Sequence, residues 1–430
     1  MNIAYRLSSL ELLFHDNEKY RFFPIVAKNS IEHKYARDCL GMENIISVNI
    51  KNESLFPELN SREIAKFTDL GKKLNTSNVQ FFLVKKSNLF LEKWSQKYKI
   101  KLLCPNYVIG EKIENKIYFD NFLDNNKLPK PASKIILSDN EKKPFSVTVL
   151  QVPESTGGEG TFLIKTQKIF SKLSRKFNKP LLAREYKKGL SLGTSIFIDK
   201  EKIFFTALER QCFNATKNNS FGYFIGVQWL PYTFFDPKSY KKIEKFLLKI
   251  GDSFLSEGLH GLINVDFILD EIGNIYCIEC NPRLTCATNQ ILAQKELCNE
   301  IDFIGLYLKD SKAQKNSANL LSKSSFSGCQ MLIFFPPEVR FPHTVKSFAP
   351  SGFFIYENNS LKKIKLKNRM DFIKLKNGLF YYNEINMGEV YQSNLQIGTL
   401  IANFSFYYSK TGKLNNAGKM VYNYFMQQAK

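Results

Sequence analysis

Two acidic side chains in one short segment of the 430-residue chain could bind a divalent cation. Residues 260–283 read HGLINVDFILDEIGNIYCIECNPR, with apolar runs on both sides of the turn-rich stretch 270–274. This pattern predicts an antiparallel hairpin. A four-residue loop would bring two pairs opposite each other, namely Asp266 with Glu279 and Asn264 with Asn281.

Period-two alternation puts both pairs on one face of the hairpin. The other face would be core, formed by Val265, Phe267, Leu269, Tyr276 and Ile278. Opposed side chains lie about 5 Å apart at Cβ, where two like charges destabilise a hairpin. A bound cation removes this repulsion, and two carboxylates with an amide (Asp266, Glu279 and Asn281) suit Mg²⁺ before Mn²⁺. The alternative is a solvated face on which the carboxylates lean apart.

A glycine-rich segment, STGGEGT, is the second candidate for binding chemistry. Gly157, Gly158 and Gly160 lie between two strand-like runs, 145–152 and 162–164. Glycine lets backbone N–H groups approach phosphate oxygens closely. The spacing matches neither a Walker loop nor a dinucleotide fingerprint, so a plain flexible turn is the alternative.

These two segments, in this order, resemble the ATP-grasp superfamily from about Glu114 to Arg283. The resemblance implies a fold that binds ATP between two α+β subdomains with two Mg²⁺ ions. It also implies activation of a carboxylate as an acylphosphate, which an amine then captures. On this resemblance Asp266, Glu279 and Asn281 bind the metals, and Arg283 steadies the transferring phosphoryl group.

Further motifs extend the resemblance to the nucleotide. ENKIYF is similar to the family's first phosphate-binding lysine site, which implies a phosphate contact from Lys116. STGGEGTF resembles its mobile phosphate loop, and LLAREYKKG its adenine hinge, with Glu185, Tyr186 and Lys187 near the base. The chain departs from the pattern at three positions: Gln151 replaces the second lysine, Arg184 the first hinge acid, and Ser191 a ribose-binding Glu.

Substrate specificity is expected in residues 209–229, in the first domain and after Arg283. Arg210 is a candidate clamp for a substrate carboxylate, because its planar guanidinium suits bidentate contact. A structural arginine is the equal alternative. We interpret His260, which precedes Gly261 at a helix-to-strand junction, as structural.

The eight cysteines indicate reduced thiols in a reducing compartment. Cys277 and Cys280 have the spacing of a redox or zinc motif. Residues three apart on a regular strand face opposite sides, so we expect the two sulfurs to diverge.

The remaining sequence predicts the elements around these segments. We expect an N-terminal α/β unit with strands over 81–84 and 101–104 and a helix over 61–74. Further helices are predicted over 111–126, within 235–258 and over 417–428. With the resemblance, the fold class is α/β and α+β: residues 1–110 form an N-terminal domain, 111–308 a two-subdomain ATP-grasp fold, 309–327 a linker and 328–430 a β-rich domain.

Composition limits the class of protein. Sixty-one Lys and Arg against forty Asp and Glu give a net charge of +21. These residues are spread along the chain, which favours a small anionic substrate over nucleic acid. No apolar run reaches the roughly 18 residues of a membrane helix, and residues 1–14 lack a signal cleavage site. We therefore expect a soluble, cytoplasmic protein.

The function predicted from these features is an ADP-forming ligase that uses ATP and Mg²⁺ (or Mn²⁺) to join a carboxylate to an amine. Its expected partners are small carboxylate and amine substrates, and no membrane partner is expected. Association into a homodimer is compatible with the sequence. One alternative is carboxylation through carboxyphosphate, as in biotin carboxylases, although NPRLTCATN lacks their Gln-Val-Glu-His run. The other is a non-catalytic nucleotide-binding protein.

Overall fold

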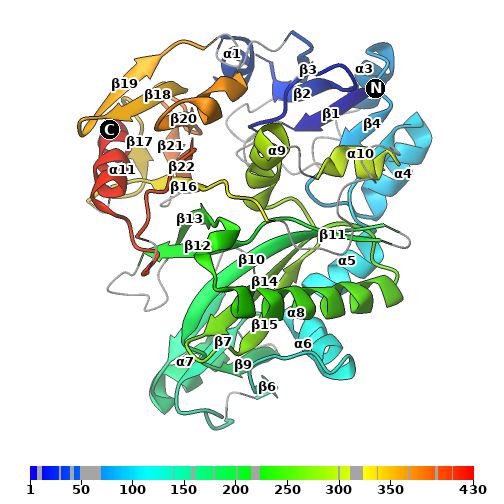
Figure 1. Cartoon of the computed structure of the whole chain (residues 1–430), viewed down its shortest axis with the longest axis vertical. Helices are drawn as coiled ribbons and strands as arrows, with labels where there is room; N and C mark the ends of the chain where they lie inside the picture. The colour runs from blue at the N-terminus through cyan, green and yellow to red at the C-terminus, as the bar shows by residue number, and fades with distance from the viewer. Residues whose placement is uncertain are drawn as a thin grey trace.

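The computed structural model describes most of the chain and leaves out several short segments. The described residues are 1–6, 12–28, 31–38, 43–48, 69–138, 140–155, 160–177, 180–199, 202–214, 223–298, 301–309, 323–336, 338–366, 369–392, 396–408 and 410–430. The contacts and elements given below all belong to these residues. Figure 1 shows the N-terminal part at the upper right, the C-terminal part at the upper left and the middle of the chain below.

The N-terminal part is the predicted α/β unit. Its five strands form a parallel sheet in the order β3-β2-β1-β4-β5. The strands are β1 Asn2–Arg6, β2 Arg21–Ala27, β3 Ile46–Val48, β4 Phe81–Leu83 and β5 Lys101–Leu103, and the helices are α1 Ile31–Asp38, α3 Leu70–Thr76 and α4 Leu89–Tyr98. Strands β4 and β5 confirm the two predicted strands. Of the helix predicted over 61–74, residues 61–68 lie outside the described residues.

The helix predicted over 111–126 is two helices. Helix α5 spans Tyr107–Glu114 and α6 spans Lys116–Asn125. The side chain of Asn115 accepts hydrogen bonds from the backbone N–H groups of Ile117 and Tyr118. An asparagine N-cap of this kind begins a new helix, so the single-helix prediction was wrong at this residue. The break puts Lys116 at the first position of α6.

A small antiparallel sheet follows, in the order β6-β9-β7-β8. Its strands are β6 Ser133–Ile136, β7 Thr148–Gln151, β8 Thr161–Ile164 and β9 Leu181–Glu185, with helix α7 Gln167–Phe177 between β8 and β9. Phe170 on α7 packs with Leu150 and Ile164 in one hydrophobic cluster. This cluster holds α7 against the sheet.

A long sheet connects the middle of the chain with its C-terminal part. Its strand order is β15-β14-β10-β12-β13-β16-β22-β20-β18-β19, and β11 pairs with β10. The strands are β10 Gly189–Ile198, β11 Ile203–Phe205, β12 Glu209–Asn214, β13 Tyr223–Trp229, β14 Gly261–Asp270, β15 Ile275–Asn281, β16 Gly328–Phe334, β18 Gly352–Glu357, β19 Ser360–Ile364, β20 Gly378–Asn383 and β22 Gln396–Ala402. Helix α8, Pro237–Ser256, contacts β10 and β11.

The predicted linker, 309–327, precedes a strand of this same sheet. Its residues 310–322 lie outside the described residues. Strand β16 then pairs with β13, so β16, β22, β20, β18 and β19 extend this sheet, whereas β17 (His343–Thr344) and β21 (Val390–Tyr391) form a two-stranded sheet of their own. The remaining elements are η2 Tyr232–Phe234, α9 Ala287–Cys298, α10 Phe303–Tyr307, η4 Arg369–Lys374 and α11 Asn416–Gln428. Helix α11 confirms the predicted terminal helix.

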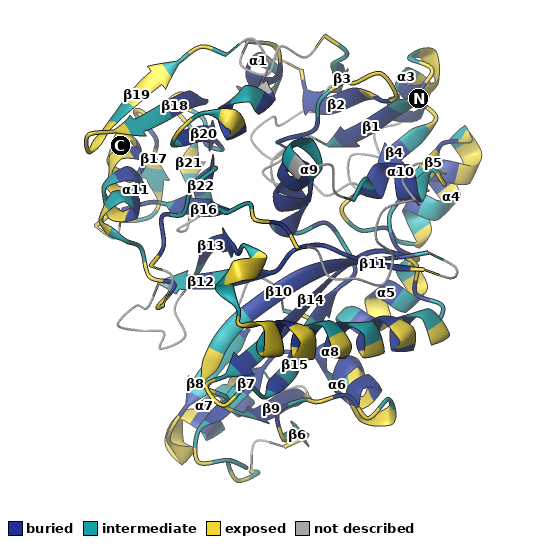
Figure 2. Ribbon diagram, viewed as in Figure 1, coloured by how far each residue is buried: buried dark blue, intermediate teal, exposed yellow. Residues whose placement is uncertain are grey.

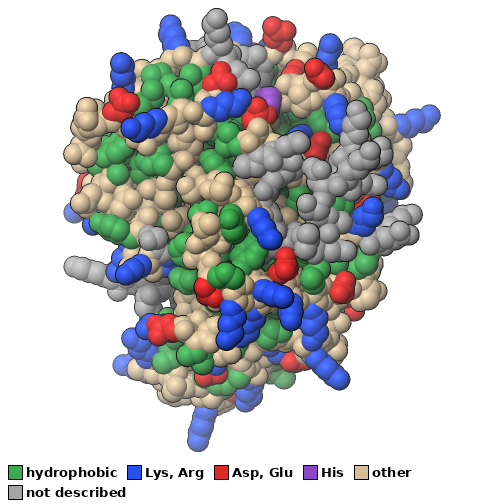
Figure 3. Space-filling view, in the orientation of Figure 1, with side chains coloured by type: hydrophobic (Ala, Val, Ile, Leu, Met, Phe, Trp, Pro, Cys, Tyr) green, Lys and Arg blue, Asp and Glu red, His purple; other side chains and the backbone are tan. Residues whose placement is uncertain are grey.

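Burial and charge follow the layers of the fold. In Figure 2 the strands of the long sheet are mostly buried, and the outer face of α8 is exposed. Figure 3 shows Lys and Arg side chains spread over this face of the molecule among Asp and Glu, with several over α8. Among the described residues, no helix is both long and apolar enough to span a membrane.

Candidate functional site

The predicted hairpin is formed by β14 and β15. Asp266 pairs with Glu279 and Asn264 pairs with Asn281, as the sequence predicts. A bulge then shifts the register, so that Phe267 pairs with Cys277 and Ile278 has no opposite residue. The bulge adds one residue to β15 and reverses the alternation on its far side.

This bulge overturns two predictions about side-chain direction. Tyr276 and Ile278 were predicted in the core, but both are half-buried and Ile278 lines a cavity. Cys277 and Cys280 were predicted to diverge, but both pack in the same hydrophobic cluster. Burial raises the pKa of each thiol, so both remain protonated and unsuited to bind a metal.

Asp266 lies at the centre of a polar network. Its Oδ1 accepts a hydrogen bond from Asn264 Nδ2, and its Oδ2 accepts one from Asn281 Nδ2, both at 3.0 Å. Burial raises the pKa of Asp266 well above its ordinary value, and the Glu279 and Glu209 charges raise it further. The ionised form therefore requires a cation, which is a property expected of a metal ligand.

Glu279 has a cationic neighbour. Lys116 Nζ lies 3.4 Å from Glu279 Oε2 and donates a hydrogen bond to the Ser155 carbonyl at 2.5 Å. Burial raises the pKa of Glu279, but the Lys116 charge, a hydrogen bond from Asn281 and the Arg283 charge together leave it below its ordinary value. The two opposed carboxylates therefore differ: Glu279 is ionised and Asp266 resists ionisation.

Arg283 lies beside the same network. Its Nε donates to Glu114 Oε1 at 2.6 Å and its Nη2 donates to Asn281 Oδ1 at 2.8 Å. Lys86 also contacts Glu114, at 2.5 Å. Burial raises the pKa of Glu114, but Arg283 and Lys86 outweigh it and lower the pKa. Glu114, which ends α5, thus orients the guanidinium of Arg283.

Arg184 is a buried link between three elements. Its Nε and Nη2 each lie 3.0 Å from Asp120 Oδ1 on α6. Its Nη1 donates to Gln151 Oε1 at 3.2 Å and to the carbonyl of the bulge residue, Ile278, at 2.6 Å. Two of the three departures from the family pattern, Gln151 and Arg184, are therefore partners of each other.

The predicted hinge and loop lie at the edge of this network. Glu185, Tyr186 and Lys187 all line the cavity. The backbone N–H groups of Glu185 and Tyr186 are already bonded to the carbonyls of Ala132 and Val147. Lys187 Nζ lies 2.7 Å from Glu185 Oε2 and over the Tyr276 ring.

Only part of the glycine loop can be described. Gly157 and Gly158 lie outside the described residues. Gly160 closes the loop, since its carbonyl accepts a hydrogen bond from the Val152 amide. A Cβ at Gly160 would lie 2.2 Å from Ser155 Oγ, so this position requires glycine.

The structure does not bring Arg210 to the cavity. Arg210 and Glu209 are successive residues of β12 and face opposite sides of the sheet. Arg210 Nη2 donates to the Lys410 carbonyl at 3.3 Å, in the C-terminal part. Arg210 therefore does not line this cavity, and its contact favours the alternative of a structural arginine. Glu209, which begins the segment expected to determine specificity but was not itself predicted to bind substrate, lines the cavity instead.

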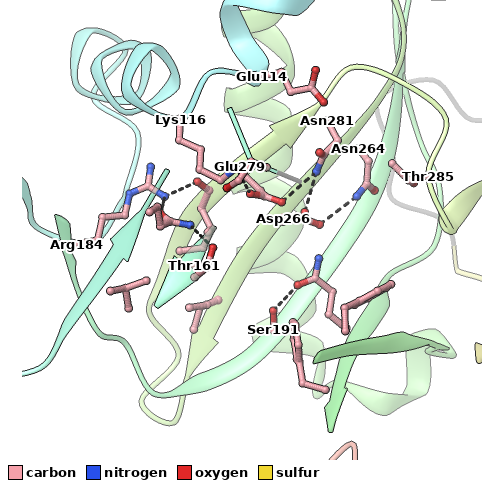
Figure 4. A pocket seen from close by; sticks show the side chains of 18 of the residues that line it. Glu114, Lys116, Thr161, Arg184, Ser191, Asn264, Asp266, Glu279, Asn281 and Thr285 are labelled. Atoms are coloured by element: carbon pink, nitrogen blue, oxygen red, sulfur yellow. Dashed lines mark hydrogen bonds and ion pairs between the residues drawn. The ribbon is translucent and has the colours of Figure 1, made fainter. Parts of the chain in front are cut away.

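One cavity of about 830 Å³ joins these groups. Figure 4 shows Asp266, Glu279, Asn264 and Asn281 converging on the sheet face, with Lys116 and Arg184 at one side. Within the described residues, no three His, Cys, Asp or Glu side chains gather round one point. The donor set is thus two carboxylates and an amide, which fits a hard divalent ion whose shell is completed by other oxygens.

A scan of family models matches the ATP-grasp domain to residues 113–287. This segment begins before Lys116 and ends after Arg283, so it contains the network described above. Residues 113–287 thus form an ATP-grasp domain. The N-terminal parallel sheet and the antiparallel ATP-grasp sheets of the chain are the typical layout of the ATP-grasp superfamily. A search of curated proteins finds no match.

Solved structures share the fold of this chain at low identity. The L-amino acid ligase from Bacillus licheniformis is 13% identical with a TM-score of 0.59, over 99% of this chain and 97% of that one. The phosphoribosylamine–glycine ligase from Thermotoga maritima is 10% identical with a TM-score of 0.60, over 100% and 97%. A biotin carboxylase from Campylobacter jejuni is 11% identical with a TM-score of 0.59, over 93% and 86%. The three proteins named here are two ligases and one carboxylase, and they share the fold of this chain.

Proposed function

We propose that the chain is an ADP-forming ligase that activates a carboxylate as an acylphosphate and joins it to an amine. The observation that carries this proposal is the convergence of Asp266, Glu279 and Asn281 with Lys116 and Arg283 on one cavity. Phosphoryl transfer requires mainly positioning and neutralisation of charge. A metal-binding set, a lysine and an arginine around one space supply these requirements.

The proposed cofactors are ATP and Mg²⁺. Asp266, Glu279 and Asn281 would hold Mg²⁺, which would supply charge neutralisation to the phosphates. Lys116 would contact the phosphates, together with Gln151 and the glycine-loop residues Gly157, Gly158 and Gly160. Glu185, Tyr186 and Lys187 would surround the base. Arg283, oriented by Glu114, would stabilise the charge of the transferring group.

A ligase is favoured over a carboxylase by the extent of the structural alignments, and the state of the nearby cysteines bears on the route of activation. Both ligases named above align over nearly their whole length, whereas the biotin carboxylase aligns over 86% of its chain. The cysteines near the site, Cys277, Cys280 and Cys286, have pKa values raised by burial. An acyl-cysteine route is therefore disfavoured, and direct attack of the carboxylate on the γ-phosphate is the simpler route.

The experiment is ADP release from the full chain with a panel of acids and amines. We expect ADP and phosphate only when a suitable acid is present, and an amide once the amine is added. Hydroxylamine in place of the amine should yield a hydroxamate from the acylphosphate. Formation of AMP and pyrophosphate, or bicarbonate-dependent ADP release without an amine, would contradict the ligase proposal. Tight ADP binding without turnover would favour the non-catalytic alternative.

A further inference from the structure

Glu209 is a buried carboxylate that the site described above does not use. Its side chain is only 2% exposed, and its Oε2 has no hydrogen-bond partner among the described residues. It nevertheless lines the cavity. Burial raises the pKa of Glu209 to about 8. A buried carboxylate without a hydrogen-bond partner costs free energy, so we expect a ligand in the cavity to supply the missing partner of Glu209.

Strand register places Glu209 in one row with the metal-binding carboxylates. Glu209 pairs with Gly193, Gly193 pairs with Asp266, and Asp266 pairs with Glu279. A Cβ at Gly193 would lie 3.0 Å from both Asp266 Oδ1 and Glu209 Oε1. The two carboxylates therefore face each other across a backbone without a side chain. Glu209 lies on the β12 side of this gap, away from Lys116 and Glu279.

Beyond Glu209, Gln211 lines the cavity on the same face of β12, and the wall after Gln211 is mainly apolar. Phe213 follows Glu209 at an even spacing on β12, so both face the cavity. Phe224 and Val227 on β13 line the same space, and the Phe213 and Phe224 rings lie 5.9 Å apart at their centroids. Cys286 also lines the cavity. Burial is the main cause that raises the pKa of its thiol to about 12, and the charge of Glu209 is the second cause.

We propose that Glu209, Phe213, Phe224 and Val227 form a subsite for the amine substrate, which binds as an ammonium ion with an apolar side chain. This inference rests on the proposed ligase function and names the class of its second substrate. An ammonium ion satisfies a buried carboxylate and lies well against aromatic rings. A second hydrated Mg²⁺ fits less well, because it requires several oxygen ligands, whereas the wall beyond Gln211 is formed by the carbon side chains of Phe213, Phe224 and Val227.

The first test measures binding without turnover, by calorimetry on the full chain with MgADP present. The probes are 2-phenylethylamine, 3-phenylpropionate and 3-phenyl-1-propanol, which share a phenyl group but differ in charge. Wild type should bind the amine about tenfold or more tightly than the other two. Glu209→Gln should remove this preference and leave MgADP affinity within about twofold. Glu257→Gln, which removes an exposed carboxylate at the C-terminal end of α8 and outside the residues that line the cavity, is the matched control and should change neither.

A second variant tests the apolar wall independently. Phe224→Ala should weaken binding of 2-phenylethylamine roughly tenfold and leave ethylamine nearly unchanged, because only the phenyl contact is lost. Equal binding of the amine by wild type and Glu209→Gln would overturn the subsite. Tight binding of 3-phenylpropionate by wild type would also overturn it. A tenfold change in the Mg²⁺ dependence of ADP binding in Glu209→Gln would instead identify Glu209 as a metal ligand, which contradicts the subsite. None of these measurements needs catalysis, so failure of the ligase assay alone would leave the subsite standing.

Discussion

The two opposed carboxylates should respond to neutralisation with opposite signs. We expect Asp266→Asn to stabilise the metal-free protein and Glu279→Gln to destabilise it. The reason is their different surroundings. Asp266 has amide partners and a carboxylate opposite, whereas Glu279 has the Lys116 ammonium at 3.4 Å. The sequence alone suggested that removing Glu279 would relieve repulsion, and the contact with Lys116 reverses that expectation.

The magnitude follows from the distances. At a pH high enough to ionise Asp266, charges about 5 Å apart across the hairpin repel by about 3 kcal/mol, for an effective dielectric constant of about 20. The pair of Glu279 and Lys116 attracts by about 5 kcal/mol at the same dielectric constant. Glu279→Gln loses this attraction and relieves the weaker repulsion, so the free energy of unfolding should fall by about 2 kcal/mol. In Asp266→Asn, loss of the repulsion raises the free energy of unfolding by about 3 kcal/mol, and one mismatched amide contact lowers it by about 1 kcal/mol.

The assay is unfolding of the full chain in EDTA, compared with unfolding in Mg²⁺ and ADP. The pKa of Asp266 is raised in the folded state, so the folded protein holds this proton longer than the unfolded chain does. Wild type should therefore lose stability as the pH rises above about 4, the ordinary pKa of this carboxyl, and the advantage of Asp266→Asn should widen as Asp266 ionises. Mg²⁺ should stabilise wild type much more than either variant. The same sign of change for both variants in EDTA would refute the reasoning, and Glu257→Gln controls for net charge.

Two further changes test the groups around this pair. Lys116→Ala should weaken ADP binding and turnover together, roughly ten- to a hundredfold, because a buried charge-assisted contact is lost. Calorimetry measures the binding and steady-state kinetics the turnover. Lys112→Ala, on the exposed side of α5, is the control. Asp120→Asn should lower the free energy of unfolding by about 3 kcal/mol, because it leaves the buried Arg184 guanidinium uncompensated. An unfolding transition equal to wild type would show that Arg184 does not depend on Asp120.

The register of the hairpin could be predicted because it depends on neighbours in the sequence. Alternating apolar residues and a turn-rich loop fix which residues oppose each other, and Asp266 does pair with Glu279. The bulge at Ile278 could not be predicted in this way. It is held by the Arg184 guanidinium, which donates to the Ile278 carbonyl from a strand 94 residues away in the sequence. The direction of Tyr276 and of the two cysteines depends on that distant contact.

Other errors came from local signals that the sequence does contain. The break between α5 and α6 is marked by Asn115, an N-cap residue in the middle of the predicted helix. The choice between Glu209 and Arg210 is different, because alternation separates their faces but does not say which face meets the cavity. That follows from the pairing of β12 with β10, which sets Glu209 opposite Gly193. The pairing of β12 with β10 could not be predicted, because local sequence patterns do not show which strands lie next to each other in a sheet.

The charges around the cavity determine how an anionic nucleotide could be held there. Arg184 replaces an acidic residue of the family pattern, yet Asp120 compensates its charge. Lys116 shares its charge with Glu279, and Arg283 shares its charge with Glu114. Each of these cations therefore already has a carboxylate partner. Bound Mg²⁺ would take over Glu279 and release Lys116 for phosphate, so the proposed metal would raise phosphate affinity both directly and by freeing a lysine.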